Sequence, residues 1–426
     1  MSARAPWLAA SGLLLAYAAM ALSAVWTVPF PNGYDELAHL SYAVSLAQTP
    51  WRELDLPSLH LLRPELGSGF GPAGNYLNHP PGFYLALGTL LPSDGWPTMG
   101  TVRLLRLVNA ALSITAVGLA LAVGLLRRLE LPLLLLYGAC VVLVPVMQAT
   151  GSGISNDNLA LLGGCTAVLG AQLALGARRG GTILLILGCV LATLAKFTAA
   201  IMLGVFAGVF LLTRIRQLGW GRVAAALLLL AAAEAVAGLP YLPFVLRYGS
   251  PVPVTPAFVA VGVEAASRQL TVNGWMPGAV LSLPAYAVAF GRWLLAGWSP
   301  VLGIEGLAGA LLLLIPGLTL LGAMPGFVLN PPGWRGRDPV LGAACVALLL
   351  TLLPHLVFSW QRYHLALGAP PFDAAPRYYL PLALAAVPAA LCWTLQRLPP
   401  RLRWAAAAVL TAGQVGFIPL LGASLD

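Results

Sequence analysis

Long apolar stretches alternate with short polar segments from one end of the chain to the other. A helix needs about 20 mostly apolar residues to cross the hydrocarbon core of a bilayer, and most of these stretches reach that length. The expected spans are residues 7–29, 102–126, 131–148, 159 to about 177, two short spans within 182–213, then 223–245, 305–328, 340–358, 379–395 and 404–421. The pattern therefore predicts an all-α polytopic membrane protein with about 11 transmembrane helices.

Basic residues mark the ends of these spans and indicate their direction. The pairs Arg127–Arg128 and Arg178–Arg179 fall on one side of the membrane when the N-terminus is placed in the cytoplasm, as the positive-inside rule requires. Two polar segments then lie outside: residues 30–100, which we expect to carry amphipathic helices, and residues 246–303. Within the second segment, the stretch 279–295 is expected to be a re-entrant or surface helix.

Composition supports a membrane location, and it argues against a nucleic-acid-binding protein and against a protein built on disulfides or zinc. Of the 426 residues, 59% are hydrophobic and 9% are charged, too few charges for a water-facing surface. We therefore expect residues 1–426 to form a single membrane domain. The net charge of +9 comes from short basic clusters between apolar stretches, so we interpret it as a topology signal and expect no nucleic-acid partner. All five cysteines lie in apolar stretches without metal-ligand spacing, which argues against disulfides and a zinc site.

The first outer segment begins with an acidic motif close to the membrane exit. Asp35, Glu36 and His39 lie within one helical turn, in the run 32–39 (NGYDELAH). On a helix along the membrane surface, Asp35 and His39 share one face, so a carboxylate and an imidazole can converge on one ligand. This arrangement suits general-base chemistry. The alternative is that the acidic residues merely begin a helix, since carboxylates are favoured in the first turn.

Two further polar motifs precede expected helix starts on the same outer side. Asn78 and His79 stand directly before two prolines, and Asp157 follows Asn156 at the start of the fourth span. Asp157 would then be a third carboxylate at the outer membrane face. Each motif also has a purely structural interpretation: Pro in the first turn of a helix for the first motif, and a helix N-cap for the second.

Two cationic residues occupy places where a charge needs a partner. Lys196 stands between the two short spans of 182–213 with apolar residues on both sides, where a charge costs a few kcal/mol unless it is paired or hydrated. Arg377 precedes two tyrosines at the outer mouth of the span 379–395, and its planar fork suits a phosphate group. The alternatives are snorkelling of Lys196 toward the outer headgroups, and headgroup anchoring by Arg377 with the tyrosines.

In their order and shared outer face, these motifs resemble glycosyltransferase superfamily C, which includes protein O-mannosyltransferases, lipid A aminoarabinose transferases and catalytic subunits of oligosaccharyltransferases. The residues that carry the resemblance are 35–39 (DELAH), 103–109 (RLLRLVN), Asn156-Asp157 and Arg377-Tyr378. They look closest to a poorly characterised bacterial branch, and the match extends to about Pro381. The resemblance implies the fold of this superfamily and a place in the bacterial inner membrane, with the active site extracytoplasmic.

The resemblance also implies a reaction and a role for each candidate residue. A hexose or pentose would move, with inversion, from a polyprenyl-phosphate or diphosphate carrier to a glycan, lipid or protein acceptor. Asp35 would act as the base, with Glu36 or Asp157 orienting the acceptor or holding a cation. Lys196 and Arg377 would stabilise the departing lipid phosphate. A magnesium or manganese ion could be held by Asp35 and Asp157. The acceptor or sugar side would be lined by His39, Asn78 and His79.

Two other functions remain open from the sequence. In a transporter or lipid flippase, Lys196, Glu234 and Arg377 would lie along a substrate or ion path near the bilayer midplane. The charge distribution speaks against this function, because most candidate polar residues gather at one membrane face. A non-catalytic membrane subunit could also retain the transferase fold, since a fold alone never proves activity.

Overall fold

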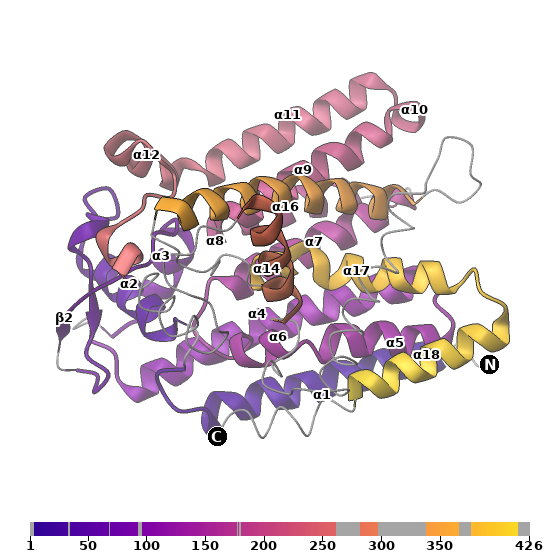
Figure 1. Cartoon of the computed structure of the whole chain (residues 1–426), viewed down its shortest axis with the longest axis horizontal. Helices are drawn as coiled ribbons and strands as arrows, with labels where there is room; N and C mark the ends of the chain where they lie inside the picture. The colour runs from indigo at the N-terminus through magenta and orange to yellow at the C-terminus, as the bar shows by residue number, and fades with distance from the viewer. Residues whose placement is uncertain are drawn as a thin grey trace.

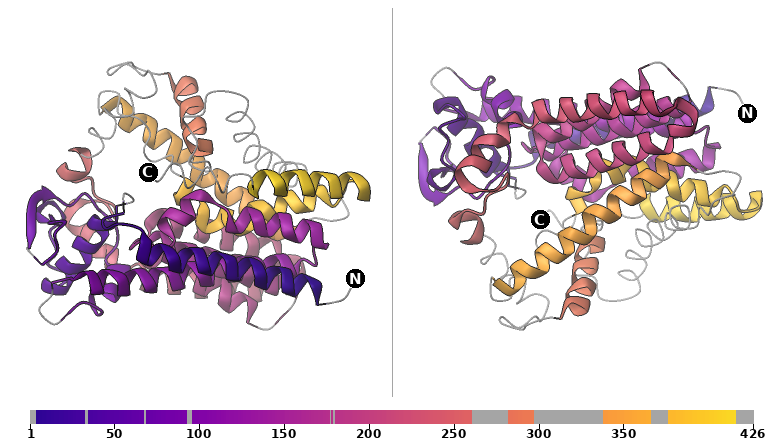
Figure 2. Two further views of the ribbon diagram at one scale, coloured as in Figure 1. Left: turned by 90° about the horizontal axis from the view of Figure 1, so that it is seen from below. Right: turned by 90° about the horizontal axis from the view of Figure 1, so that it is seen from above.

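The computed structural model describes residues 4–32, 35–67, 69–92, 96–176, 178, 180–260, 282–296, 338–365 and 376–415. Most of these residues are helical, and the long helices run side by side in one bundle (Figure 1). The elements of the first outer segment gather at one end of the bundle together with a short later helix, as the turned views also show (Figure 2). They include α2 (Glu36–Gln48), α3 (Gly82–Gly88) and α12 (Leu242–Tyr248).

Within the described residues, five helices are long and apolar enough to cross a bilayer. They are α1 (Ala5–Thr27), α4 (Met99–Leu126), α7 (Asp157–Leu175), α11 (Trp220–Ala237) and α16 (Pro339–Leu365). Shorter apolar helices are α5 (Leu131–Val142), α8 (Gly181–Ala195), α9 (Phe197–Thr213) and α17 (Leu380–Leu395). The chain also forms α6 (Pro145–Thr150), α10 (Ile215–Leu218), α14 (Leu283–Ala296), α18 (Pro400–Val415) and the 3-10 helices η1 (Leu56–Ser58), η2 (Leu239–Tyr241) and η4 (Pro376–Tyr378). The prediction of a helical, multi-pass membrane protein is confirmed.

Expected spans coincide with helices over most of the described chain, and two differences have local causes. The expected span 223–245 is cut short, because α11 ends at Ala237 and Pro240 lies in the 3-10 helix η2 that follows. The expected span 131–148 is interrupted, because α5 ends at Val142 and α6 begins at Pro145, whose ring cannot continue a helix. Residues 182–213 divide into α8 and α9 at Lys196, as predicted, since this residue has extended backbone with φ −158° and ψ 131°. Lys196 is therefore held in a break between two apolar helices.

Part of the predicted topology falls on residues that the structure does not describe. The expected span 305–328 lies outside the described residues, and so do residues 261–281 and 297–303 of the second outer segment. The count of 11 spans and the depth of the stretch 279–295, which α14 largely covers, stay predictions.

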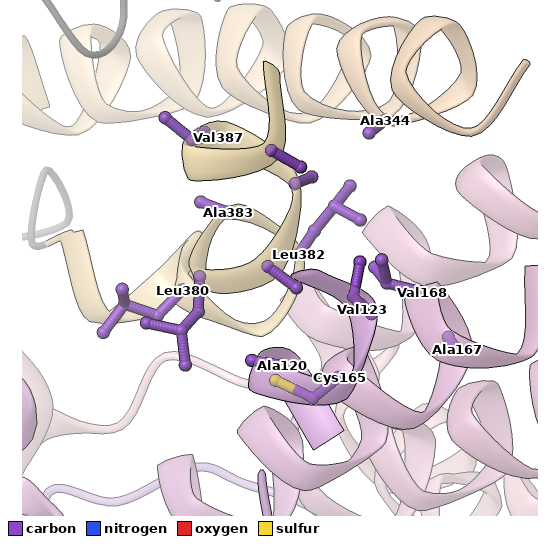
Figure 3. Packing of buried hydrophobic residues seen from close by; sticks show 14 of the residues in the cluster. Ala120, Val123, Cys165, Ala167, Val168, Ala344, Leu380, Leu382, Ala383 and Val387 are labelled. Carbon is purple, nitrogen blue, oxygen red and sulfur yellow. The ribbon is translucent and has the colours of Figure 1, made fainter. Parts of the chain in front are cut away.

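Helix α7 packs closely against α8 and α17, and glycines permit the approach. A Cβ atom at Gly163 would lie 2.6 Å from the carbonyl oxygen of Gly188, and one at Gly164 would overlap the carbonyl group of Pro381. Small residues let helix backbones come together in a membrane, where close packing drives association. The apolar cluster around this junction includes Cys165, Val168, Leu382 and Ala383 (Figure 3). The packing places the start of α7 near the residues that precede α17.

The first outer segment folds around a small core of its own. Helices α2 and α3 pack with an antiparallel pair of strands, β1 (His60–Leu62) and β2 (Phe70–Gly74), around the buried rings of Tyr42 and Tyr84. The strands were not expected from the sequence. Helix α2 also differs from the expected surface helix: residues 38–46 are all buried, because β1 and α3 contact it. The start of α2 is thereby rigidly placed.

Candidate active site

Glu36 is the buried centre of a clamp that holds the outer segment on the bundle. Arg106 on α4 donates two hydrogen bonds to it, from Nε to Oε1 and from Nη2 to Oε2, each of 2.7 Å. The backbone N–H groups of Asn32 and Ile154 donate to the same carboxylate at 2.8 and 3.2 Å. Arg106 also donates to the carbonyl oxygen of Val28 at 2.7 Å. Because all four lone-pair positions of Glu36 are occupied, this side chain serves the framework.

Asp35 lies at the start of α2, directly beside this clamp. Its backbone is in the left-handed region, with φ +62°, a conformation that Asp tolerates better than most residues but that the surroundings must enforce. Its Oδ1 accepts a hydrogen bond of 2.8 Å from the hydroxyl of Tyr76. Its Oδ2 accepts one of 2.7 Å from Nη2 of Arg377. Both carboxylate oxygens are thus fixed in place.

Asp157 and Lys196 form a second buried ion pair beside the same arginine. Nζ of Lys196 donates to Oδ1 of Asp157 at 2.6 Å, and Nε of Arg377 lies 3.8 Å from Oδ2 of Asp157. The ring of Tyr378 faces Lys196, with Nζ 4.0 Å from the ring centroid, which is a cation–π contact. The structure therefore brings together four charged residues that the sequence singles out, two carboxylates and two cations, from four separate chain segments.

Two histidine rings stack in the outer segment close to this cluster. Nδ1 of His39 lies 2.8 Å from the hydroxyl of Tyr84, and the rings of His39 and His79 stack with 6.2 Å between centroids. Burial, partly offset by the carboxylate of Asp35, lowers the pKa of His39 to about 4. Burial and the charge of Lys196 lower the pKa of His79 well below its usual range. Both rings are therefore neutral at pH 7.

The histidines differ in their partners. The imidazole of His79 makes no hydrogen bond to any described residue, although its backbone carbonyl accepts one of 2.9 Å from the hydroxyl of Tyr42. Neighbouring Asn78 points its amide elsewhere: Nδ2 donates to the carbonyl oxygen of Pro253 at 2.9 Å and ties the outer segment to the chain after α12. His79 is thus the polar side chain of this motif that keeps its hydrogen-bonding capacity.

The Asp35 carboxylate is an anion at neutral pH. Burial opposes the charged form, but the charge of the Arg377 guanidinium, together with the hydrogen bonds from Arg377 and the hydroxyl of Tyr76, outweighs it. The pKa of Asp35 therefore lies below its usual value. While Arg377 remains bound, the carboxylate is a weak base, because the same interaction that favours the anion opposes its protonation.

Three side chains of the site have no role assigned to them from the sequence. Arg106 belongs to the run 103–109 that carries the family resemblance, but nothing in its spacing indicates a partner 70 residues away in Glu36. Tyr76 precedes the Asn-His-Pro-Pro motif by two positions, and Tyr378 directly follows Arg377. An aromatic residue beside a candidate cation or a polar motif is the signal that could have found these two tyrosines.

Comparisons with known proteins find similar structures but no similar sequences. No model of a known protein family matches the sequence, and no curated protein matches it. ArnT from Cupriavidus metallidurans in the apo state is similar in structure, with a TM-score of 0.51 and 15% identity over 96% of this chain and 63% of that chain. The oligosaccharyltransferase AglB from Archaeoglobus fulgidus, with an inhibitory peptide and a dolichol-phosphate, has a TM-score of 0.50 and 12% identity over 98% of this chain and 56% of that chain. An oligosaccharyltransferase structure from the same organism, with zinc and sulfate, has a TM-score of 0.51 and 16% identity over 97% of this chain and 52% of that chain.

These similarities establish the class of the fold. ArnT is an aminoarabinose transferase, and it shares the fold of glycosyltransferase superfamily C with AglB. The chain therefore has the fold of glycosyltransferase superfamily C, as the sequence resemblance implied. It spans between about half and two thirds of the length of the structures that it matches. At such low identity a likeness carries the fold alone, and the activity has to be argued from the site.

Proposed function

We propose that this chain is a membrane glycosyltransferase that moves a sugar from a polyprenyl-phosphate or diphosphate carrier to an extracytoplasmic acceptor, with inversion. The observation that carries the proposal is the meeting of Lys196 and Arg377 with Asp35 and Asp157 at one site. Cations suit the phosphate of a lipid carrier, and a carboxylate suits an attacking hydroxyl group. The dolichol-phosphate in the AglB complex, a protein of the same fold, supports a donor of this class.

Lys196 and Arg377 would stabilise the negative charge that develops on the departing phosphate. Both cations are held before a donor arrives: Lys196 by Asp157 and the ring of Tyr378, Arg377 by two carboxylates. Cations that are already in place stabilise a transition state without a reorganisation cost at the moment of reaction. Because phosphate is a good leaving group, this electrostatic clamp would replace a general acid.

Asp35 would take the proton of the acceptor hydroxyl as its oxygen attacks the anomeric carbon. The new glycosidic bond forms while the bond from the anomeric carbon to the phosphate oxygen breaks, and the phosphate leaves with the electron pair. When a donor phosphate shares the guanidinium of Arg377, the negative charge of the phosphate offsets the charge that keeps the pKa of Asp35 low, and Asp35 becomes a stronger base. Donor binding would thus activate the base.

The remaining candidate residues take supporting roles. Asp157 would hold Lys196 in place, since its Oδ1 is engaged by that ammonium group. His39 and His79 would line the acceptor or sugar side as neutral rings, with the unengaged imidazole of His79 available to a sugar hydroxyl. Glu36 and Asn78 would maintain the framework, because their polar atoms bind Arg106 and the backbone.

The site would open to the extracytoplasmic side of a bacterial inner membrane, with the N-terminus in the cytoplasm. The positive-inside rule supports this orientation, because the basic pairs after the second and fourth expected spans then lie in the cytoplasm. The acceptor would be a hydroxyl group of a glycan, lipid or protein at that face. This hydroxyl is the one that Asp35 would deprotonate.

Transfer of radiolabelled sugar from a panel of polyprenyl-phosphate donors, by the full chain in lipid nanodiscs, tests this function. Asp35→Asn and Lys196→Ala should each lower kcat/KM by about 100-fold or more, the usual contribution of one base or one charge-stabilising group. Asp55→Asn is the matched control, because Asp55 is a carboxylate of the same outer segment whose cationic partner is Arg247. This variant should keep full transfer.

A folded wild-type protein that neither transfers sugar nor hydrolyses any donor would overturn the proposal. Solute uptake in proteoliposomes would then favour a transporter. The contacts of Lys196 and Glu234 do not themselves favour that function, because Lys196 pairs with Asp157 and Glu234 accepts a hydrogen bond from Thr193. An Asp35→Asn variant that keeps full function in cells would instead favour a non-catalytic subunit.

A further inference from the structure

The two acidic side chains of the site already have a cation between them. Nη2 of Arg377 donates to Oδ2 of Asp35 at 2.7 Å, and its Nε lies 3.8 Å from Oδ2 of Asp157. The other oxygen of each carboxylate is also engaged: Tyr76 donates to Asp35 at 2.8 Å, and Lys196 donates to Asp157 at 2.6 Å. Three of the four carboxylate oxygens therefore accept a hydrogen bond, and the fourth, Oδ2 of Asp157, faces the guanidinium of Arg377 at ion-pair distance.

A divalent metal ion does not fit this arrangement. Magnesium and manganese bind through oxygen ligands in a near-octahedral shell, most often one or two carboxylates with waters and substrate phosphate. Here two carboxylates face two side-chain cations, so their charges already cancel. A metal ion would add two positive charges within a few ångströms of Lys196 and Arg377, and that repulsion is strong in a buried site. The described residues also contain no group of three or more His, Cys, Asp and Glu side chains suited to a metal.

We propose that the guanidinium of Arg377 takes the place of a divalent metal between Asp35 and Asp157, so that the site works with side-chain cations alone. The planar guanidinium carries a permanent charge and can donate to two carboxylates from different edges. Removing this side chain leaves Oδ2 of Asp35 and Oδ2 of Asp157 without their cation, which creates a metal site. The catalytic half of this proposal rests on the proposed function, whereas the metal-binding half does not.

Arg377 is also well placed to serve a donor phosphate in the way a metal would. Its guanidinium is held near Lys196 by shared contacts: Asp157 pairs with both cations, and the ring of Tyr378 lies within 4.0 Å of Nζ of Lys196 and 5.6 Å of the guanidinium carbon. Two fixed positive charges can then meet one phosphate group. These two side chains thus supply the positive charge that a bound metal ion would otherwise supply to the phosphate.

Binding of Mn²⁺ to the full chain in nanodiscs, measured by the loss of the free Mn²⁺ signal in electron paramagnetic resonance, tests the metal-binding half directly. Wild type should show no saturable Mn²⁺ site that depends on Asp157. Arg377→Ala should gain a saturable Mn²⁺ site, because Asp35 and Asp157 lose the cation between them. The double variant Arg377→Ala with Asp157→Asn should lose that gain.

Arg247→Ala is the matched control for the loss of an arginine. Arg247 pairs with the single carboxylate of Asp55 at 3.7 Å, so its removal leaves no pair of carboxylates and should leave Mn²⁺ binding unchanged. A saturable Mn²⁺ site in wild type that Asp157→Asn abolishes would overturn the proposal. So would an Arg377→Ala protein that gains no Mn²⁺ binding, once its thermal unfolding midpoint and that of Arg377→Lys show that it is folded.

The catalytic half has a separate test. Sugar transfer by wild type should be unchanged, within about twofold, after extensive treatment with a chelator and should not rise on addition of Mn²⁺ or Mg²⁺. Transfer that disappears with the chelator and returns with Mn²⁺ would overturn this half. If wild type transfers no sugar under any condition, the proposed function fails, while the Mn²⁺ measurements still decide the metal-binding half.

Discussion

The buried neutral ring of His39 should make the folded chain sensitive to mild acid. Its pKa is lowered to about 4 by burial, whereas in the unfolded chain it returns to about 6.5. Below pH 6.5 the unfolded chain therefore binds more protons than the folded chain. The free energy of unfolding decreases as the pH is lowered from about 6.5 to about 4. The expected loss between pH 7 and pH 5 is about 2 kcal/mol. The midpoint of thermal unfolding, followed by tryptophan fluorescence at both pH values, measures it.

Two variants separate His39 from general acid effects. His39→Gln keeps a polar group near Tyr84 but cannot be protonated, so its unfolding midpoint should fall less between pH 7 and pH 5 than that of wild type. His60→Gln replaces an exposed histidine on β1 and should behave as wild type. Equal pH responses of His39→Gln and wild type would contradict the explanation.

The ion pair between Glu36 and Arg106 is expected to be essential for folding. Both side chains are nearly inaccessible, with 1% and 2% exposure, so Glu36→Gln leaves a buried guanidinium without its counter-charge. Loss of one partner from a buried pair costs about 3–5 kcal/mol. Thermal unfolding and the yield of folded protein measure this loss. Glu130→Gln is the control: Glu130 is 50% exposed in its pair with Arg403, and its loss should cost less than about 1 kcal/mol.

At the scale of helices, the closeness of α7 to α17 controls the distance between Asp157 and Arg377. Gly164 on α7 faces the carbonyl group of Pro381, so Gly164→Ala should push the helices apart and cost about 1–3 kcal/mol. Sugar transfer should fall as well, because Asp157 lies at the start of α7 and Arg377 just before α17. Unfolding and transfer assays on the same preparation test both effects.

A glycine in a neighbouring helix gives the control for this substitution. Nothing lies within 4 Å of the position where a Cβ atom would stand at Gly204 in α9. Gly204→Ala should therefore leave stability and transfer near those of wild type, or raise stability slightly through helix propensity. If both alanine variants lose activity equally, the contact between α7 and α17 does not set the site geometry.

Helices could be predicted from the sequence wherever a long apolar stretch lies between polar residues, as the agreement at α1, α4 and α17 illustrates. The break at Lys196 was predicted too, because a charge inside an apolar run needs an exceptional place. The strands β1 and β2 were not, since each is short and their pairing depends on contacts with α2 rather than on alternation. The local apolar pattern thus predicts the long helices, whereas the short strands depend on tertiary contacts.

Across the whole molecule, the candidate residues could be predicted but their pairing could not. Asp35 and Arg377 are 342 positions apart, and Arg106 reaches Glu36 across 70 positions. No spacing in the sequence expresses such contacts. They arise because the packing of α4, α7 and α17 brings the ends of distant segments together at one end of the bundle. The site is thus a property of the bundle as much as of its motifs.

The orientation of the bundle is testable in cells. If the first outer segment is extracytoplasmic, a membrane-impermeant maleimide should label Ser58→Cys, an exposed position of η1, in intact cells. Gln217→Cys, exposed in α10 between basic residues, should be labelled only after the cells are opened. Wild type gives the background, because four of its five cysteines are buried and the fifth is partly so. The reverse pattern would place Asp35 and Arg377 on the cytoplasmic side, where the acceptor would have to be cytoplasmic.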